Sequence, residues 1–94
     1  MRWPVPKIDQ NAQSLIQFLN KIKNEANPAE SQHIVEIVDD LQKGITQTDE
    51  KKKASLIENA FNKSKMLNTI LKTSENLVKY SASFGTLIVK LFGL

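Results

Sequence analysis

The densest group of side chains that could do chemistry lies in the stretch HIVEIVDD, residues 33–40. On a helix, His33, Glu36 and Asp40 would lie on one side, because they stand at positions i, i+3 and i+7. An imidazole and two carboxylates could bind a divalent metal ion. Three ligands from one helix seldom surround an ion, and the sequence has no second histidine and no second carboxylate-rich helix. We therefore predict no metal site here and interpret the group as a solvated acidic face.

Other catalytic arrangements lack essential parts in this sequence. Without cysteine there is no thiolate nucleophile, no disulfide and no thiolate zinc site. A serine triad would depend on the single His33, with no strand–turn–helix elbow to present the serine. The glycines, Gly44, Gly85 and Gly93, do not form a phosphate-binding loop before a helix. The sequence therefore predicts a protein that is not an enzyme and needs no cofactor.

Lysines are the second candidate for a binding surface, and they are concentrated in residues 48–94. That half holds eight basic and four acidic residues, against five and six in residues 1–47. Three lysines spaced by seven and a run of three could follow a phosphate backbone: Lys65, Lys72 and Lys79 with Lys51–Lys53. Glu58 and Glu75 interrupt this face, and no aromatic residues alternate with the lysines for base stacking. Nucleic-acid binding through the lysine-lined face is therefore a lesser alternative.

The elements that must position these residues are helices in a single domain, residues 1–94. Residues 1–8, MRWPVPKI, are predicted to form an extended arm, because two prolines disfavour helical angles before them. Trp3 is the expected anchor of this arm on the helices. A first helix is expected over about 10–26 with Asp9 as its N-cap. A second is expected over 28–43, because NPAE can form a capping box with proline at the first helical position.

The remaining residues pose a problem of length. Helical periodicity runs from about 48 to 92 with no proline and no glycine before Gly85. One straight helix would be about 67 Å long, whereas each of the first two would be only about 24 Å. A break near 62–65, where the apolar stripe loses phase, would give helices over about 48–62 and 65–92 and a compact bundle. We predict an all-α fold of three or four antiparallel helices, the last two separate or continuous. No break, or one only near 81–85, would leave apolar surface for other subunits.

The closing stretch SASFGTLIVKLFGL carries one charge, Lys90, among large apolar residues. A helix with so little charge is best explained by protein on more than one side. We predict that a partner or a second copy covers these side chains: Leu77, Phe84, Leu87, Ile88, Leu91 and Phe92. The leading function is a non-enzymatic interaction or assembly module that acts through apolar helix faces. The alternative is a membrane-associated factor whose residues 84–94 lie on lipid as an amphipathic helix.

Two further expectations concern the compartment and the family. The N-terminus lacks the apolar run of a signal peptide, and no stretch approaches the roughly 20 apolar residues of a membrane span. We therefore expect a cytoplasmic or membrane-peripheral protein. NPAE before an acidic helix and the tail pattern S-x-S-F-G-x-x-I-x-K-L-F-G resemble small helical modules that accompany bacterial effector and defence proteins. That resemblance assigns no functional residues, and helical immunity and regulatory proteins of similar size fit the composition nearly as well. Among functional classes, we expect an adaptor.

Overall fold

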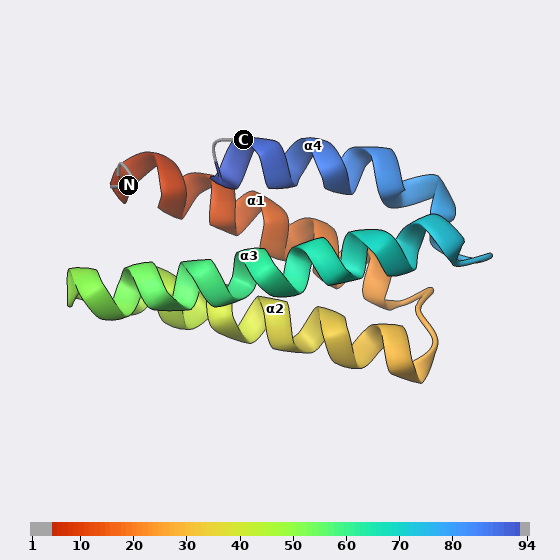
Figure 1. Ribbon diagram of the computed structural model, residues 1–94, viewed down its shortest axis with the longest axis horizontal. Coiled ribbons are helices and arrows are strands. Elements are labelled where there is room, and N and C mark those ends of the chain that lie inside the picture. The colour runs from red at the N-terminus through yellow and green to blue at the C-terminus, as the bar shows by residue number, and fades with distance from the viewer. Residues whose placement is uncertain (1–4, 93–94) are drawn as a thin grey trace.

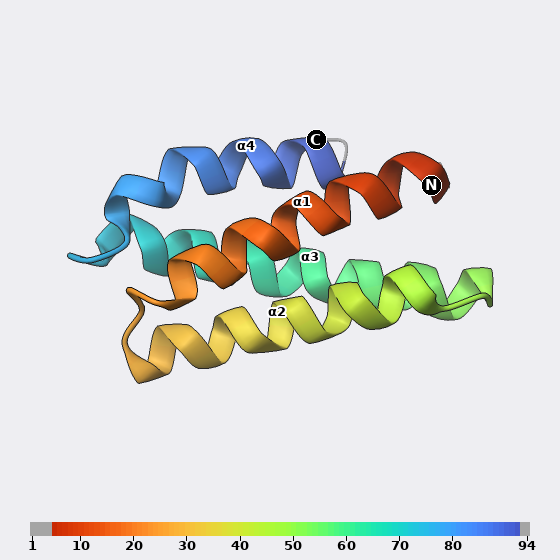
Figure 2. The same cartoon turned by 180° about the vertical axis from the view of Figure 1, so that it is seen from behind.

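The computed structural model describes residues 5–92, with side chains from residue 9 onward, and these residues form four α-helices. The helices are α1 (Val5–Lys23), α2 (Pro28–Thr46), α3 (Glu50–Thr73) and α4 (Ser81–Phe92), with a 3-10 turn, η1 (Val78–Tyr80), before α4. Consecutive helices run antiparallel, and α4 packs on both α3 and α1, so the four close into a bundle (Figures 1 and 2). The predicted all-α fold is confirmed.

The start of α2 is fixed by its local sequence. The Asn27 side chain accepts a hydrogen bond from the Glu30 backbone N–H at 2.8 Å, and the Glu30 carboxylate accepts one from the Asn27 backbone N–H at 3.0 Å. This reciprocal capping box, with Pro28 at the first helical position, satisfies backbone donors that no helix can pair internally. The prediction of this helix start is confirmed.

The start of α1 differs from the prediction. Residues 5–8, assigned to an extended arm, belong to the helix, whose first turn tolerates Pro6 because N–H groups there have no intrahelical acceptor. Asp9 is therefore inside α1 rather than its N-cap. The remaining residues of the arm, 1–4, with the proposed anchor Trp3, lie outside the described residues.

Gly44 and the start of α3 also need correction. The second helix is predicted to end at residue 43, but α2 continues to Thr46 and Gly44 faces α3. α3 begins at Glu50 rather than near residue 48, and its N-cap is Asp49, whose carboxylate accepts hydrogen bonds from the backbone N–H groups of Lys51 and Lys52. A carboxylate there also interacts favourably with the helix dipole.

The predicted break near 62–65 is wrong, because α3 continues through it to Thr73 and the chain turns at 74–80. Phe61 and Lys63 looked out of phase because α3 packs between two helices and uses a wide face. The true interruption follows Leu71, where the next positions on the stripe are the polar Ser74 and Glu75. The Ser74 hydroxyl accepts a hydrogen bond from the Leu77 N–H at 3.1 Å and so stabilises the turn.

The core runs through the middle of the bundle and draws on every helix. Its fully or almost fully buried apolar side chains are Ala12, Leu15, Leu19, Ile22, Ile34, Ile37, Leu41, Ile57, Ala60, Leu67, Leu71, Leu77, Phe84, Ile88, Leu91 and Phe92. The apolar side chains of α1 and α2 recur at helical spacing, and Ala26 and Val38 lie at the edge of the core. Because α4 folds back, residues 48–92 do not form the straight helix that would have needed other subunits.

Candidate functional site

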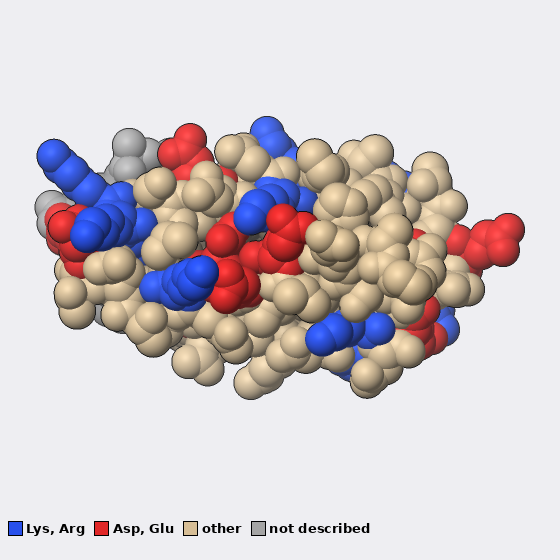
Figure 3. Space-filling model, turned by 90° about the horizontal axis from the view of Figure 1, so that it is seen from below, with Lys and Arg blue, Asp and Glu red and all other residues tan. Residues whose placement is uncertain are grey.

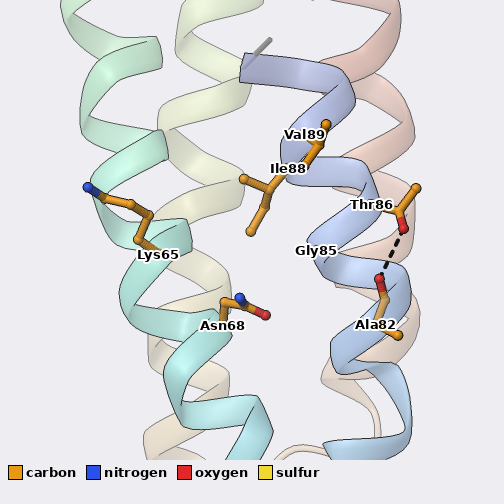
Figure 4. A pocket seen from close by; sticks show the side chains of 7 residues that line it. All are labelled: Lys65, Asn68, Ala82, Gly85, Thr86, Ile88 and Val89. Atoms are coloured by element: carbon orange, nitrogen blue, oxygen red, sulfur yellow. Dashed lines mark hydrogen bonds between the residues drawn. The ribbon is translucent and has the colours of Figure 1, made fainter. Parts of the chain in front are cut away.

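The described surface has a groove between α3 and α4, which we call the α3–α4 groove. It has a volume of about 520 Å³. Figure 4 shows the residues that line it: Lys65, Asn68, Ala82, Gly85, Thr86, Ile88 and Val89. Its position follows from the packing of α4, which lies close to α1 and less closely to α3.

The groove is open on its α4 side because small side chains of α4 border the space in front of α3. Phe84, Ile88 and Leu91 recur at helical spacing and are buried in the core. Ala82 and Gly85 lie beside that face and are too small to fill the space in front of α3. A Cβ atom built on Gly85 would have no described atom within 4 Å outside its own helix backbone and neighbours. Val89, one turn further on, is 47% exposed.

The α3 wall is partly aromatic and partly polar. The Phe61 and Phe92 rings, 4.7 Å apart between centroids, join α3 to α4 beyond one end of the groove. The Lys65 ammonium group lies 4.8 Å from the Phe61 ring centroid, a favourable cation–π contact, and points away from α4 in Figure 4. Asn68 projects toward α4, and its Oδ1 atom is buried without a hydrogen-bond partner among the described residues.

The side chains that line the groove offer apolar and hydrogen-bonding contacts. The described lining residues include no carboxylate, imidazole or thiol that could act as a base or a nucleophile. The groove instead combines an apolar floor, formed by Ile88, with an amide that has an unused acceptor. An apolar side chain or helix with a nearby hydrogen-bond donor would fit these properties.

Two of the residues considered for a metal site, Glu36 and Asp40, form ion pairs with a lysine of α3. The Lys63 ammonium group lies 2.8 Å from an Asp40 carboxylate oxygen and 3.9 Å from a Glu36 oxygen. The single positive charge of Lys63 thereby offsets part of the charge of the two carboxylates, which lie on one side of α2. Figure 3 shows such neighbouring acidic and basic side chains on the face seen from below. His33 is half-buried on the same helix, and no group of three suitable ligands occurs among the described residues.

The predicted line of lysines is not continuous. Because α3 ends at Thr73, Lys79 is on η1 instead of in register with Lys65 and Lys72. Lys53 is buried, and its ammonium group donates to Asp9 at 2.7 Å and to the Gly44 carbonyl oxygen at 3.0 Å. Lys53 thus joins α1, α2 and α3, and it is not available to a phosphate.

Lys79 also has a partner, at the end of the bundle where α1 meets η1. Its ammonium group lies 3.2 Å from the Glu25 carboxylate, which also accepts a hydrogen bond from the Tyr80 hydroxyl. The hydrogen bond from Tyr80, followed by that from Lys79, lowers the pKa of Glu25 below its ordinary value of 4.5. The same carboxylate raises the pKa of Lys79 and of Tyr80.

The structure places the predicted interface residues of the tail inside the chain's own fold. Leu87 is partly buried against the core. The other five are buried in it: Leu77, Phe84, Ile88, Leu91 and Phe92. The helices that cover them are α1 and α3 of the same chain. A partner is therefore not needed to explain their burial, although Ile88 also forms the floor of the α3–α4 groove and Leu87 is only partly buried.

Sequence reasoning missed the residues that form the groove, notably Asn68, Ala82 and Gly85. A signal was present, because Ala82, Gly85 and Val89 recur at threes and fours beside the apolar face of α4. It predicts a helix with one bulky and one small side. It does not say which neighbour the small side meets.

Comparison of the chain with protein-family models, curated proteins and solved structures found no match. Within residues 5–92, no helix is both long enough and apolar enough to span a membrane.

Proposed function

We propose that the protein is a non-enzymatic helical interaction module whose α3–α4 groove receives an apolar helix of another polypeptide. The observation that carries the proposal is Gly85. Glycine inside a helix destabilises it by about 0.5–1 kcal/mol relative to alanine. The described fold has space for a larger side chain there, since a Cβ would meet nothing within 4 Å. Packing within the described fold does not require a glycine at this position. The effect of the glycine is to leave the groove open.

Asn68 supports the proposal independently of Gly85. Buried polar atoms in proteins nearly always have a hydrogen-bond partner, and an exception calls for an explanation. Asn68 Oδ1 is such an exception within the described residues, and it belongs to a residue that lines the groove. A donor on a bound helix would satisfy it.

The two alternatives from the sequence have less support. Lipid binding by residues 84–94 would use Phe84, Ile88, Leu91 and Phe92, which are buried against the chain's own helices. Nucleic-acid binding would use the lysine line, which is interrupted by the turn at 74–80 and by the ion pair between Lys79 and Glu25.

Site-specific photo-crosslinking tests the proposal. A benzophenone amino acid replaces Thr86, which lines the groove and is exposed, or Met66, which is 58% exposed and does not line it. We expect a protein adduct from position 86 in cells that express the chain and none from position 66. The adduct should disappear when Gly85→Leu fills the groove and persist with Ser83→Leu, a matched change at an exposed position of α4 outside the groove lining.

The crosslinked protein is then produced separately and tested for direct binding. Binding to the wild type and not to Gly85→Leu supports the proposal, provided that circular dichroism shows the variant to be folded. Equal adducts from positions 86 and 66, or adducts that Gly85→Leu leaves unchanged, would contradict it.

A further inference from the structure

We infer that α4 is an exchangeable element: when the chain straightens at Ser74, α3 and α4 form one helix, and two copies trade their α4 helices. Each α4 then docks on α1 and α3 of the other copy, in the contact that it already makes within its own fold. We call this form the exchanged dimer. It does not depend on the α3–α4 groove, so it goes beyond the proposed function.

The bend between α3 and α4 is confined to a short stretch of backbone. Ser74 has φ −81° and ψ 126°, which is extended, whereas Leu77 and Ser81 are again in the right-handed helical region. The Val78 N–H donates to the Ser74 carbonyl at 3.0 Å, in the i to i−4 pattern of an α-helix. Helical backbone therefore resumes within three residues of the point where the chain leaves it.

The sequence of the turn is compatible with a continuous helix. Residues 74–80, SENLVKY, contain neither proline nor glycine, the two residue types that most disfavour a helix interior. The Ser74 side chain favours the bend, because its hydroxyl accepts a hydrogen bond from the Leu77 N–H at 3.1 Å, as serine does at a helix N-cap. A straight chain loses that cap and gains the backbone hydrogen bonds of an unbroken helix.

The straight form fixes the partner of α4, because α4 cannot remain in its own site. The side chains of Phe84, Ile88 and Leu91, which are buried in the bundle, would lie in water. The surface that fits them is the site that α4 has left, and a second open copy offers the same site. Exchange between two copies therefore restores the contacts of α4 and changes only the hinge.

The polar contacts on both sides of α4 show what the exchange would restore. Before the helix, the Glu25 carboxylate lies 3.2 Å from the Lys79 ammonium group and accepts a hydrogen bond from the Tyr80 hydroxyl. At its end, Asn11 Nδ2 donates to the Lys90 carbonyl at 3.1 Å. In the exchanged dimer these become contacts between copies, and the ion pair joins opposite charges. Lys90, the one charge of α4, is exposed and stays so.

The directions of the helices agree with a two-fold symmetric exchange. In the bundle, α3 and α4 run antiparallel (Figure 1). In the exchanged dimer, each α4 extends its own α3 and lies antiparallel to α3 of the other copy, so the relation between the two helices is kept. A straight helix over residues 50–92 would be about 65 Å long. The bundle measures 39 Å along its longest axis, so the exchanged dimer is elongated.

Protein concentration decides which form is populated. Within one chain, α4 docks at an effective concentration on the order of millimolar, so the bundle dominates in dilute solution. Because α4 must leave the core before it can be exchanged, the two forms interconvert slowly. The exchanged dimer is therefore expected after refolding at high protein concentration, and it persists on dilution long enough to be separated.

Refolding from urea at concentrations up to about a millimolar, followed by size-exclusion chromatography with light scattering, measures the dimer. The dimer fraction of the wild type should rise with the refolding concentration. Ser74→Ala should raise it several-fold, because it removes the cap of the bend and introduces the best helix former. Thr73→Ala is the matched control, since Thr73 is already helical and exposed, and it should match the wild type.

Glu75→Pro is the variant that blocks the exchange. Proline disfavours helical angles in the residue before it and breaks a helix interior, but it is tolerated in the first turn of a helix. The change therefore keeps Ser74 extended and excludes a helix that continues through the exposed position 75. The variant should refold only to the monomer, with the far-UV circular dichroism of the wild type.

Cysteine crosslinking distinguishes exchange from other dimers, and the sequence contains no native cysteine. The Asn11 and Lys90 positions meet in the fold. The double variant Asn11→Cys with Lys90→Cys should be linked within one chain by a short bis-maleimide, which shows that the pair is in reach. Chains that carry one change each, refolded together, should give a covalent heterodimer, and Glu75→Pro in both chains should abolish it.

The inference is overturned if the wild type and Ser74→Ala both stay monomeric after refolding at about a millimolar. A dimer that a folded Glu75→Pro variant forms equally well would also overturn it, as would a dimer whose Asn11→Cys and Lys90→Cys chains do not crosslink. Photo-crosslinking at Thr86 tests the α3–α4 groove separately, so failure of the exchange leaves the proposed function standing.

Discussion

α3 packs between α2 and α4, and each of these two helices has one glycine that lies near α3. The two glycines have opposite effects on packing. On the α2 side, Gly44 allows such a close approach that an added Cβ would lie 2.9 Å from Ile57 Cδ1. On the α4 side, Gly85 opens space that no described atom uses. The first glycine serves packing within the fold, and the second leaves packing incomplete. The comparison teaches that residue type alone does not reveal a glycine's role, because its neighbours decide it.

The polar groups on the two sides of α3 also differ in their partners. Toward α2, the Lys63 ammonium group pairs with Asp40, and the Gly44 carbonyl accepts from Lys53. Toward α4, the Asn68 acceptor has no partner among the described residues. Ser64 Oγ, on the same helix, is also buried without a hydrogen-bond partner among the described residues, so the distinction between the two sides of α3 rests on the open space at Gly85. We interpret the α4 side as the one that serves a partner.

The largest expected effect separates the two faces of α4. The double change Ile88→Asp with Leu91→Asp should unfold the chain, because two carboxylates would enter the core and each lost apolar burial is worth about 1.5–3 kcal/mol. Val89→Asp, on the exposed face of the same helix, should leave the melting temperature nearly unchanged. Thermal unfolding followed by circular dichroism measures both. A double variant with native helicity and stability would show that α4 is not packed as described.

The next effect compares the two glycines directly. Gly44→Leu should destabilise the fold by about 1–3 kcal/mol or more, because the added side chain overpacks the contact with Ile57. Gly85→Leu should leave stability unchanged or raise it by up to about 1 kcal/mol, because it replaces a helical glycine where there is room. Urea denaturation of both variants decides the matter. Equal losses would remove the distinction between the two sides of α3.

A third change tests whether the ion pair on the α2 side contributes to stability. Lys63→Ala should cost about 1–2 kcal/mol, because it leaves the mostly buried Asp40 carboxylate, 12% exposed, without its partner. Lys43→Ala is the control, since its 2.9 Å pair with Asp39 lies on the open surface and is worth about 0.5 kcal/mol or less. Similar denaturation midpoints for the two variants would mean that Asp40 does not depend on Lys63.

A cap outside both contacts gives a reference value. Asn27→Ala, with Pro28 retained, should cost about 1 kcal/mol, because it removes the side-chain acceptor of the capping box. The loss should add to that of Lys63→Ala in the double variant, since the two sites share no contact. An unchanged midpoint for Asn27→Ala would show that the cap does not stabilise α2.

The smallest effect is a pH dependence at the end of the bundle. The hydrogen bond from Tyr80 lowers the pKa of Glu25, so its stabilising contribution is complete above the unfolded value of 4.5 and is lost as pH falls through the lower folded value. Tyr80→Phe should raise the pKa of Glu25 toward 4.5 and weaken the acid dependence slightly. Carboxyl NMR titration of Glu25 measures the shift. An unaltered pKa in the variant would contradict this account of the cluster.

The candidate groove could be foreseen only in part. In the sequence, Ala82, Gly85 and Val89 recur beside the apolar face of α4, but the predicted interface did not use this signal. The sequence did not place Asn68 opposite them, because that pairing depends on the turn at 74–80. The predicted interface instead used Phe84, Ile88 and Leu91, whose apolar character suits a core and a partner equally well.

The sequence by itself determined the helical fold, the cap at Asn27 and the stripes that line the core, because capping and periodicity act between residues a few positions apart. It did not determine where residues 48–92 divide, since Phe61 and Lys63 disturb the stripe as visibly as Ser74 and Glu75 do. The tertiary structure decided that question. A wide buried face on α3 accommodates the first pair between two neighbouring helices, whereas no helix face in the described fold buries the second. It also decided which glycine is enclosed and which is open, because that property belongs to the facing helix and not to the glycine.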